Sequence, residues 1–174
     1  MLNYVKNLSL ARGAGWIALA SAGMLGFGMY LQHVVGLEPC PMCIVQRYAL
    51  ILVAVCATFA WAIGLKSSKK QVSSTVQKVF AALGLLFAGG GAFVAARQSF
   101  LQWYPPEVLS CGRDFYGMVE TFPLKRAIPM IFKGGGDCTK VDWTLLGGSI
   151  ANWSFVAFVA MGLVLLVLLV RRGR

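Results

Sequence analysis

The sequence predicts an all-α integral membrane protein built as a four-helix bundle, and three observations support this fold class. Of the 174 residues, 58% are apolar, and the mean hydropathy of +0.71 lies far above that of an ordinary globular chain. Four stretches carry little or no charge over the roughly 18 residues that a helix needs to cross about 30 Å of hydrocarbon. The segments on one side of these stretches are basic and lack acidic residues. We expect a single membrane domain over residues 1–174.

The four predicted membrane helices cover residues 14–31, 44–65, 76–96 and 152–170. Backbone groups in contact with lipid must form their hydrogen bonds within their own segment, so each stretch is expected to be helical. Four crossings place both termini on the same side of the membrane. They leave a short first outer loop and a long second one of about residues 98–151, where we expect catalytic residues.

Small residues recur every four positions in the first and third helices, which lets helix backbones approach closely. They are Ala18, Ala22 and Gly26 in the first helix and Gly84, Ala88, Ala92 and Ala96 in the third. We interpret both stripes as packing surfaces of a compact bundle. The three consecutive glycines at positions 89–91 are expected to loosen the third helix locally.

Charged residues orient the bundle in the membrane. One set of connecting segments and termini holds only basic charges, at Lys6, Arg12, Lys66, Lys69, Lys70, Lys78, Arg171, Arg172 and Arg174. Because loops rich in Lys and Arg remain in the cytoplasm, both termini are predicted to be cytoplasmic. The outer loops hold a nearly balanced set of charges. The net charge of +10 therefore reflects topology and attraction to anionic lipid, and it does not indicate nucleic-acid binding.

Four of the five cysteines fall on the outer side, where disulfides can persist. They are Cys40 and Cys43 in the first outer loop and Cys111 and Cys138 in the second. Cys56 lies in the middle of the second helix and is interpreted as a small packing residue.

Cys40 and Cys43 form a Cys-Pro-Met-Cys motif at the start of the second helix. Pro41 suits the first helical position, which places Cys40 near the N-cap and Cys43 on the first turn. Free backbone N–H groups and the helix dipole favour an anion there, so a thiolate is stabilised. A disulfide between these two cysteines would close a very short loop and contribute little stability, which favours a redox role.

Arg47 lies four residues after Cys43, on the same helical face and about one turn deeper. A charge at the boundary between headgroups and hydrocarbon indicates function, although a snorkelling arginine that anchors the helix is the simpler alternative. A lipid-soluble acceptor such as a quinone fits both this depth and the two-electron chemistry of a dithiol.

Two other uses of the four outer cysteines remain open at this point. A zinc site is disfavoured because one CxxC and two single cysteines lack the paired spacing of zinc ribbons. Two inert disulfides that staple the loops of a non-enzymatic membrane protein are the second alternative. Arg47, directly beneath the CxxC, argues against that alternative.

Taken together, these motifs resemble the DsbB family of disulfide bond formation proteins. The resemblance rests on the run from Glu38 to Arg47 at the head of the second helix, on residues 102–105 (Gln-Trp-Tyr-Pro), and on Gly-Asp-Cys ending at Cys138. It covers nearly the whole chain. The vitamin K epoxide reductase group is an alternative, but there the CxxC follows the loop pair, whereas here it comes first.

The resemblance implies a quinone-dependent thiol oxidoreductase of the bacterial inner membrane with its active loops in the periplasm. Its soluble partner would be a DsbA-type dithiol oxidase, and its cofactor ubiquinone or menaquinone. Cys111 would take the mixed disulfide with that partner and pair with Cys138. Cys40 would exchange with the loop pair, and Cys43 would face the quinone.

The resemblance also places Arg47 and Gln98 beside the quinone ring. Some family members have a histidine where this sequence has Gln98. An amide can donate a hydrogen bond but cannot carry a proton at neutral pH, so the route of the proton is left open.

Overall fold

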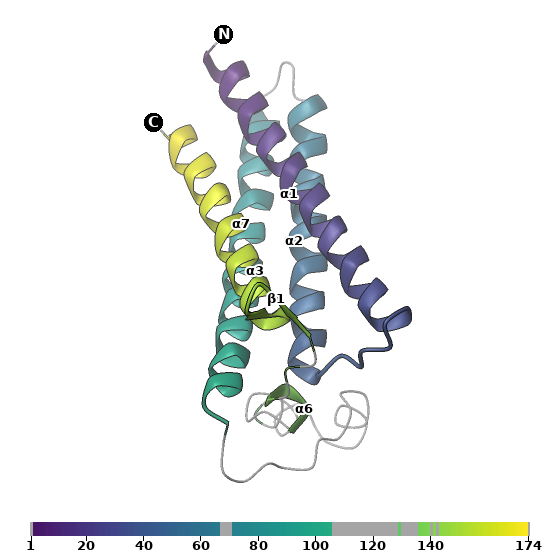
Figure 1. Ribbon diagram of the computed structural model, residues 1–174. Coiled ribbons are helices and arrows are strands. Elements are labelled where there is room, and N and C mark those ends of the chain that lie inside the picture. Colours follow the sequence, from purple (N-terminus) through teal and green to yellow (C-terminus); the bar gives the residue numbers. More distant parts are fainter. Residues whose placement is uncertain are drawn as a thin grey trace.

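Four long helices form the protein, whose structure is a computed structural model that describes residues 2–66, 71–105, 129, 136–139, 141 and 143–173. These helices are α1 (Leu2–His33), α2 (Pro41–Lys66), α3 (Gln71–Trp103) and α7 (Ile150–Gly173), and they run side by side (Figure 1). Each contains a segment long and apolar enough to cross a membrane. The predicted four-helix membrane bundle is therefore confirmed.

The helices extend beyond the predicted segments, and one difference matters for the site. The prediction that the long loop begins at residue 98 is wrong, because α3 continues to Trp103. A charge such as Arg97 ends an apolar stretch but not a helix, and the first proline after it is Pro105. Gln98 therefore belongs to a regular helix, which fixes its side chain more firmly than a loop would.

Packing explains how the bundle is held together. α3 packs against α2 and α7, and α1 packs against α2. The core contains mainly aliphatic side chains, among them Leu10, Val53, Leu165 and the ring of Phe158. Large apolar side chains such as Trp16, which is 72% exposed, cover the outside. This is the expected pattern for a bundle whose outer surface meets lipid.

The small residues of α3 act as packing positions. A methyl group added at Gly91 would overlap the ring of Phe158 on α7, and one added at Gly84 would lie 3.4 Å from Leu165 and 3.5 Å from Cys56. Gly89 and Gly90 have no such neighbour. α3 is helical throughout these glycines, so its backbone shows no interruption at positions 89–91.

A buried glutamine ties α3 to α2 in the half of the bundle near the termini. The Gln77 side chain is fully buried, and its amide nitrogen donates a hydrogen bond to the Ala60 carbonyl oxygen at 2.9 Å. Gly64 leaves the space for it, because a methyl group there would overlap the Gln77 amide. We interpret this contact as structural.

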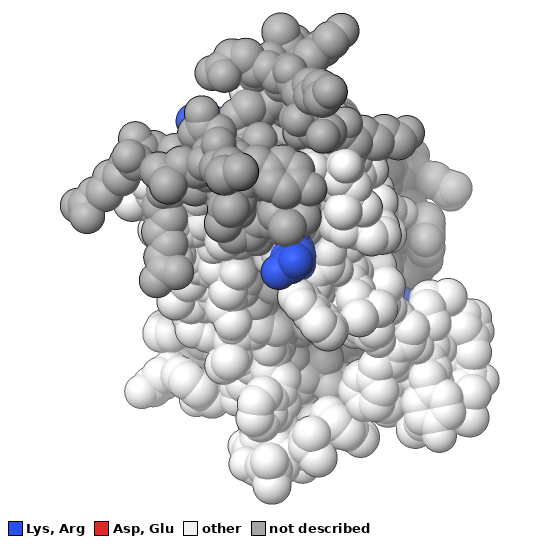
Figure 2. Space-filling model, turned by 90° about the horizontal axis from the view of Figure 1, so that it is seen from above, with Lys and Arg blue, Asp and Glu red and all other residues white. Residues whose placement is uncertain are grey.

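The two ends of the bundle differ. α1 begins and α7 ends at the same end (Figure 1). The described atoms of that end show basic side chains and no acidic ones (Figure 2). The opposite end carries the short helix α6 (Gly136–Thr139) and an antiparallel hairpin of β1 (Thr144–Leu145) and β2 (Gly148–Ser149). α6 lies close to the start of α2, and the hairpin packs against the start of α7 (Figure 1).

Replacing Gly91 with Ala is expected to lower the free energy of unfolding by about 1–3 kcal/mol, because the added methyl group overpacks against Phe158. Gly90→Ala is the matched control and should be neutral or slightly stabilising, since nothing lies within 4 Å of its new methyl group. Thermal unfolding of both variants in the same detergent measures the difference. Equal shifts for the two variants would contradict this packing account.

Candidate active site

The site is built around the first turn of α2. Pro41 begins the helix, and the Cys40 carbonyl oxygen accepts the first helical hydrogen bond from the Ile44 N–H at 3.1 Å. The Cys43 N–H donates to the Cys40 sulfur at 3.2 Å. Cys40 therefore caps the helix as the sequence predicts, and its sulfur receives an N–H group that has no partner inside the helix.

Three cysteine sulfurs converge at this turn. The Sγ atoms of Cys40 and Cys43 lie 2.7 Å apart. Cys138, on α6, is completely buried and packs in the same cluster as Cys40, Met42, Val94 and Leu101. Cys111 lies outside the described residues. The structure therefore brings three of the four predicted redox cysteines together, although 95 residues of sequence separate Cys43 from Cys138.

The surroundings of Cys40 disfavour a thiolate at that position. Hydrogen bonding to Cys138, hydrogen bonding to Cys43 and burial together raise the pKa of the Cys40 thiol above its ordinary value. A thiol with a raised pKa is a poor leaving group in disulfide exchange. Negative charge released at this cluster is therefore better placed on a neighbouring sulfur than on Cys40.

Gln98 faces the same sulfurs from α3. Its side chain is buried, and its Nε2 atom lies 3.3 Å from the sulfur of Cys40 and 3.3 Å from that of Cys43. Its Oε1 atom accepts a hydrogen bond from Gln46 Nε2 at 2.6 Å and lies farther from Cys43, at 3.8 Å. Gln98 thus contacts the thiols directly.

Arg47 connects α2 to α1 about one helical turn after Cys43, toward the middle of the bundle. Its guanidinium donates to the Gly28 carbonyl oxygen at 3.0 Å and to the Gln32 side-chain oxygen. These contacts satisfy part of its hydrogen-bonding capacity while the group stays within the bundle. Arg47 is therefore held in a fixed place, which a freely snorkelling side chain would not be.

A pocket of about 620 Å³ adjoins the thiols and opens between the helices. Its lining combines Cys43, Arg47 and Gln98 with a largely apolar wall that includes Phe27 of α1 and Phe158 of α7. α1 and α7 contribute the largest apolar share of the wall, and α2, α3, the residues before α2 and the hairpin segment supply the rest. A mostly apolar cavity with a few polar groups at one end is typical of a site for a lipid-soluble molecule.

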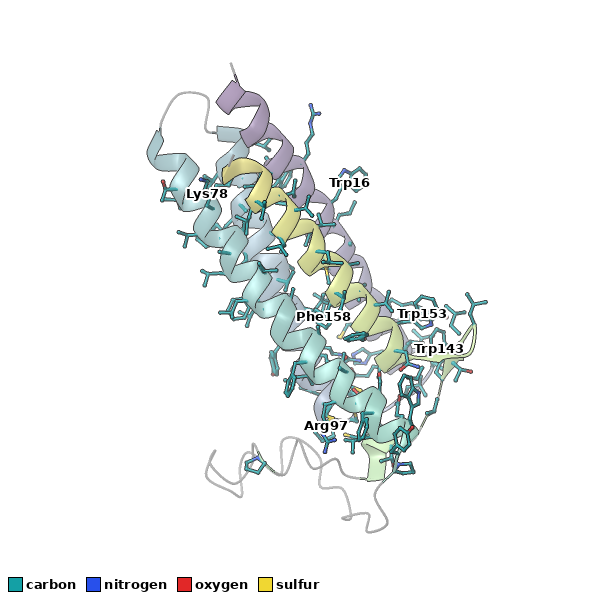
Figure 3. The ribbon with its side chains drawn as sticks, turned by 90° about the vertical axis from the view of Figure 1, so that its left-hand side faces the viewer. Trp16, Lys78, Arg97, Trp143, Trp153 and Phe158 are labelled. Carbon is teal, nitrogen blue, oxygen red and sulfur yellow. The ribbon has the colours of Figure 1, made fainter. Side chains whose placement is uncertain are left out.

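The hairpin and two tryptophans form part of the pocket lining. Trp143 packs edge-on against Phe27 with ring centroids 5.7 Å apart, and Trp153 Nε1 donates to the Leu145 carbonyl oxygen at 3.0 Å. Both tryptophans lie at the Arg97 end of the bundle, opposite Lys78 (Figure 3). Ser149 links the hairpin to α3 and α7. Its hydroxyl donates to the Gln102 side-chain oxygen at 2.6 Å and caps α7 by accepting from the Asn152 N–H at 3.4 Å.

Sequence reasoning missed Gln46 and the hairpin. Gln46 is polar in an otherwise apolar stretch, directly before Arg47 and one turn after Cys43, and this was a usable signal. The hairpin gave only the weak signal of a Leu-Gly-Gly run, in which Leu146 and Gly147 adopt positive φ angles of 51° and 80°. Cys56 lies among the helices beside Gly84 as expected.

The fold and site together define a class of protein: a multi-pass membrane thiol oxidoreductase. Its thiols gather at one end of a membrane-spanning bundle, beside a pocket suited to a lipid-soluble molecule. Cysteine pairs in this arrangement can exchange disulfides and transfer two electrons.

Comparison with known proteins identifies the family. Residues 11–168 match the family described as Disulfide bond formation protein DsbB. Disulfide bond formation protein B of Polaromonas naphthalenivorans (strain CJ2) is 66% identical over 158 residues, covering 91% of this chain and 90% of that protein. The protein of the same name from Acidovorax sp. (strain JS42) is 62% identical over 174 residues, covering 100% of this chain and 95% of its own length. The chain belongs to the DsbB family.

Membership of the family establishes the general activity of the protein. The protein is a membrane thiol oxidase that forms disulfide bonds, and electron transfer to a quinone follows from the family. The family assignment sets aside the vitamin K epoxide reductase-like enzyme and the stapled, non-enzymatic membrane protein as alternatives.

The convergence of the sulfurs predicts a specific cross-link. In a variant with Cys43→Ala and Cys111→Ala, mild oxidation should join Cys40 to Cys138, because no other outer thiol remains. Peptide mass spectrometry under non-reducing conditions identifies the bond. Cys56 is the internal control and should stay unbonded. A variant in which Cys138 oxidises only between molecules, while Cys40 stays free, would contradict the observed cluster.

Proposed function

We propose that the four outer cysteines form a two-pair relay that reoxidises a periplasmic DsbA-type dithiol protein and passes the electrons to ubiquinone or menaquinone. The pairs are Cys40 with Cys43 and Cys111 with Cys138. The single observation that carries this proposal is that Cys138 packs beside Cys40 and Cys43, and that Cys40 and Cys43 also line one largely apolar pocket. A water-soluble donor and a lipid-soluble acceptor need a thiol pair facing each phase.

The first half of the relay takes electrons from the partner. A thiolate of the reduced partner attacks Cys111, and Cys138 leaves as a thiolate. The second thiol of the partner then attacks the mixed disulfide, which releases the oxidised partner and the Cys111 thiolate. Two electrons now reside on Cys111 and Cys138.

The second half moves these electrons to the membrane pair. Cys138 attacks the Cys40 sulfur, a Cys40–Cys138 bond forms, and Cys43 leaves with the electron pair as a thiolate. Cys111 then attacks Cys138, which restores the loop disulfide and releases Cys40. The burial of Cys138 beside Cys40 and the raised pKa of Cys40 support Cys40 as the attacked sulfur and Cys43 as the leaving group.

The pocket fits a quinone headgroup with part of its tail. Its volume of about 620 Å³ lies within the roughly 300–1,000 Å³ of ligand sites, and its wall is mainly apolar. A bound quinone supplies an acceptor for two electrons and two protons. Cys43 and Gln98 line the pocket near its polar end, and the Arg47 guanidinium can hold a ring oxygen and stabilise negative charge.

The orientation follows from charge and chemistry. We place the end with both termini in the cytoplasm, because the charged side chains that Figure 2 shows there are basic. The thiol end then faces the periplasm across the bacterial inner membrane. That compartment is oxidising, so disulfides made there persist.

Anaerobic quinone reduction by the purified protein in detergent tests the relay directly. A reduced DsbA-type protein is added, and the loss of quinone absorbance is followed. Cys43→Ala should abolish the reaction, because it removes the sulfur that carries the electron pair to the quinone in the proposed relay. Unchanged turnover in Cys43→Ala would refute its role, and Cys56→Ala serves as a cysteine control that should be nearly silent.

Arg47→Ala should raise the apparent KM for quinone by about tenfold, the loss expected for one charge-assisted hydrogen bond. The KM for the partner protein should stay unchanged, because Arg47 lies below the thiols inside the bundle. Arg47→Lys retains the charge but loses the planar donor geometry, so its apparent KM for quinone should lie between those of the parent protein and Arg47→Ala. Steady-state kinetics with each substrate varied in turn separates the constants. A rise confined to the KM for the partner protein would place Arg47 in a different role.

A further inference from the structure

Two buried glutamines, from different helices, form a directional pair against the thiols. Gln98 of α3 is 4% exposed and Gln46 of α2 is 6% exposed. Gln46 donates through Nε2 to the Gln98 oxygen at 2.6 Å. The other end of the Gln98 amide, its Nε2 atom, then faces Cys40 and Cys43 at 3.3 Å each.

The direction of this amide decides its chemistry. An amide presents two N–H donors at one end and a carbonyl acceptor at the other. With the N–H groups toward the sulfurs, the amide stabilises a thiolate, whereas the opposite orientation would set oxygen lone pairs against the same charge. While Gln46 presents its own N–H group, turning Gln98 around would bring two buried donors face to face, which is unfavourable.

We propose that Gln46 is a positioning residue that holds the Gln98 amide with its N–H groups toward the sulfurs, and that Gln98 thereby stabilises the charge released on Cys43. The inference rests on the proposed relay. When Cys138 attacks Cys40, the Cys40–Cys43 bond breaks, the Cys40–Cys138 bond forms, and the electron pair leaves on Cys43. No proton or further reactant is needed. Gln98 contacts a reacting sulfur and is catalytic in this step, whereas Gln46 acts only through Gln98.

A hydrogen bond to an ionised acceptor is stronger than one between neutral groups, and a buried setting strengthens it further. The pair therefore biases the disulfide equilibrium toward the form with Cys43 free. This bias readies Cys43 for its acceptor before the acceptor reacts. In this role Gln98 only donates a hydrogen bond, and its side chain does not need to accept or release a proton.

The test is an internal competition that needs neither partner nor quinone. In a Cys111→Ala background, one disulfide is shared among Cys40, Cys43 and Cys138. The two pairings that include Cys40 leave either Cys43 or Cys138 free, and the third pairing is recognised by its free Cys40. The oxidised protein is equilibrated in detergent at about pH 8, quenched with acid to remove the reactive thiolates, and labelled with a maleimide after unfolding. Mass spectrometry then gives the ratio of free Cys43 to free Cys138.

Three variants replace a glutamine by the similarly shaped but apolar methionine. Gln98→Met should lower the ratio of free Cys43 to free Cys138 by about tenfold, the effect of one hydrogen bond to a charge. Gln46→Met should lower it by about twofold to threefold, because both amide orientations of Gln98 become populated. Gln77→Met is the control, since Gln77 is an equally buried glutamine that donates to Ala60 in the other half of the bundle. It should leave the ratio unchanged.

The double variant separates positioning from simple packing. Because Gln46 acts through Gln98, adding Gln46→Met to Gln98→Met should lower the ratio no further. Additive effects, an unchanged ratio in Gln98→Met, or an equal shift in Gln77→Met would each overturn the inference while the relay stands. If the parent protein never releases Cys43, the relay itself fails and the inference falls with it.

Discussion

The first turn of α2 is the constraint on which the rest of the structure depends. Pro41 fixes where the helix starts, and Cys40 caps it, so the sulfurs of Cys40 and Cys43 are held 2.7 Å apart at the end of a membrane-spanning helix. Nothing in a flexible loop could keep a dithiol at that depth. In the same turn the Cys43 N–H, which has no partner inside the helix, donates to the Cys40 sulfur, so the turn that positions the two thiols also bonds one of them.

The other helices are arranged to complete that turn. α3 brings Gln98 to the sulfurs, and its continuation to Trp103 gives the amide a rigid base. α1 holds the Arg47 guanidinium through Gly28, and all four long helices contribute to the pocket wall. Polar groups buried at membrane depth are costly unless they are bonded. Here the hydrogen bonds that satisfy Gln98 and Arg47 also fix the direction in which each side chain points. The same contacts therefore stabilise the buried polar groups and order the site.

Much of this architecture could be predicted from the sequence, because apolar length, basic loops and the Cys-Pro-Met-Cys spacing act locally. The helix ends could not, since a charge such as Arg97 interrupts hydropathy without ending a helix. The partners of Gln98 and Arg47 were also beyond reach, because they depend on how the helices are rotated against one another. Gln46 was overlooked for this reason, although its polarity was visible. The burial of Cys138 beside Cys40 is a contact between residues 98 positions apart in the sequence, which local patterns do not encode.

The central claim is that the acceptor binds in the pocket beside Cys43, and photoaffinity labelling tests it most directly. The reconstituted protein is illuminated with an azido-quinone, and the labelled peptides are identified by mass spectrometry. The account predicts label on the pocket wall, around Phe27 of α1 and Trp153 of α7, and competition by unlabelled quinone. Label confined to the lipid-facing surface around Trp16, which is 72% exposed and outside the pocket wall, would contradict it.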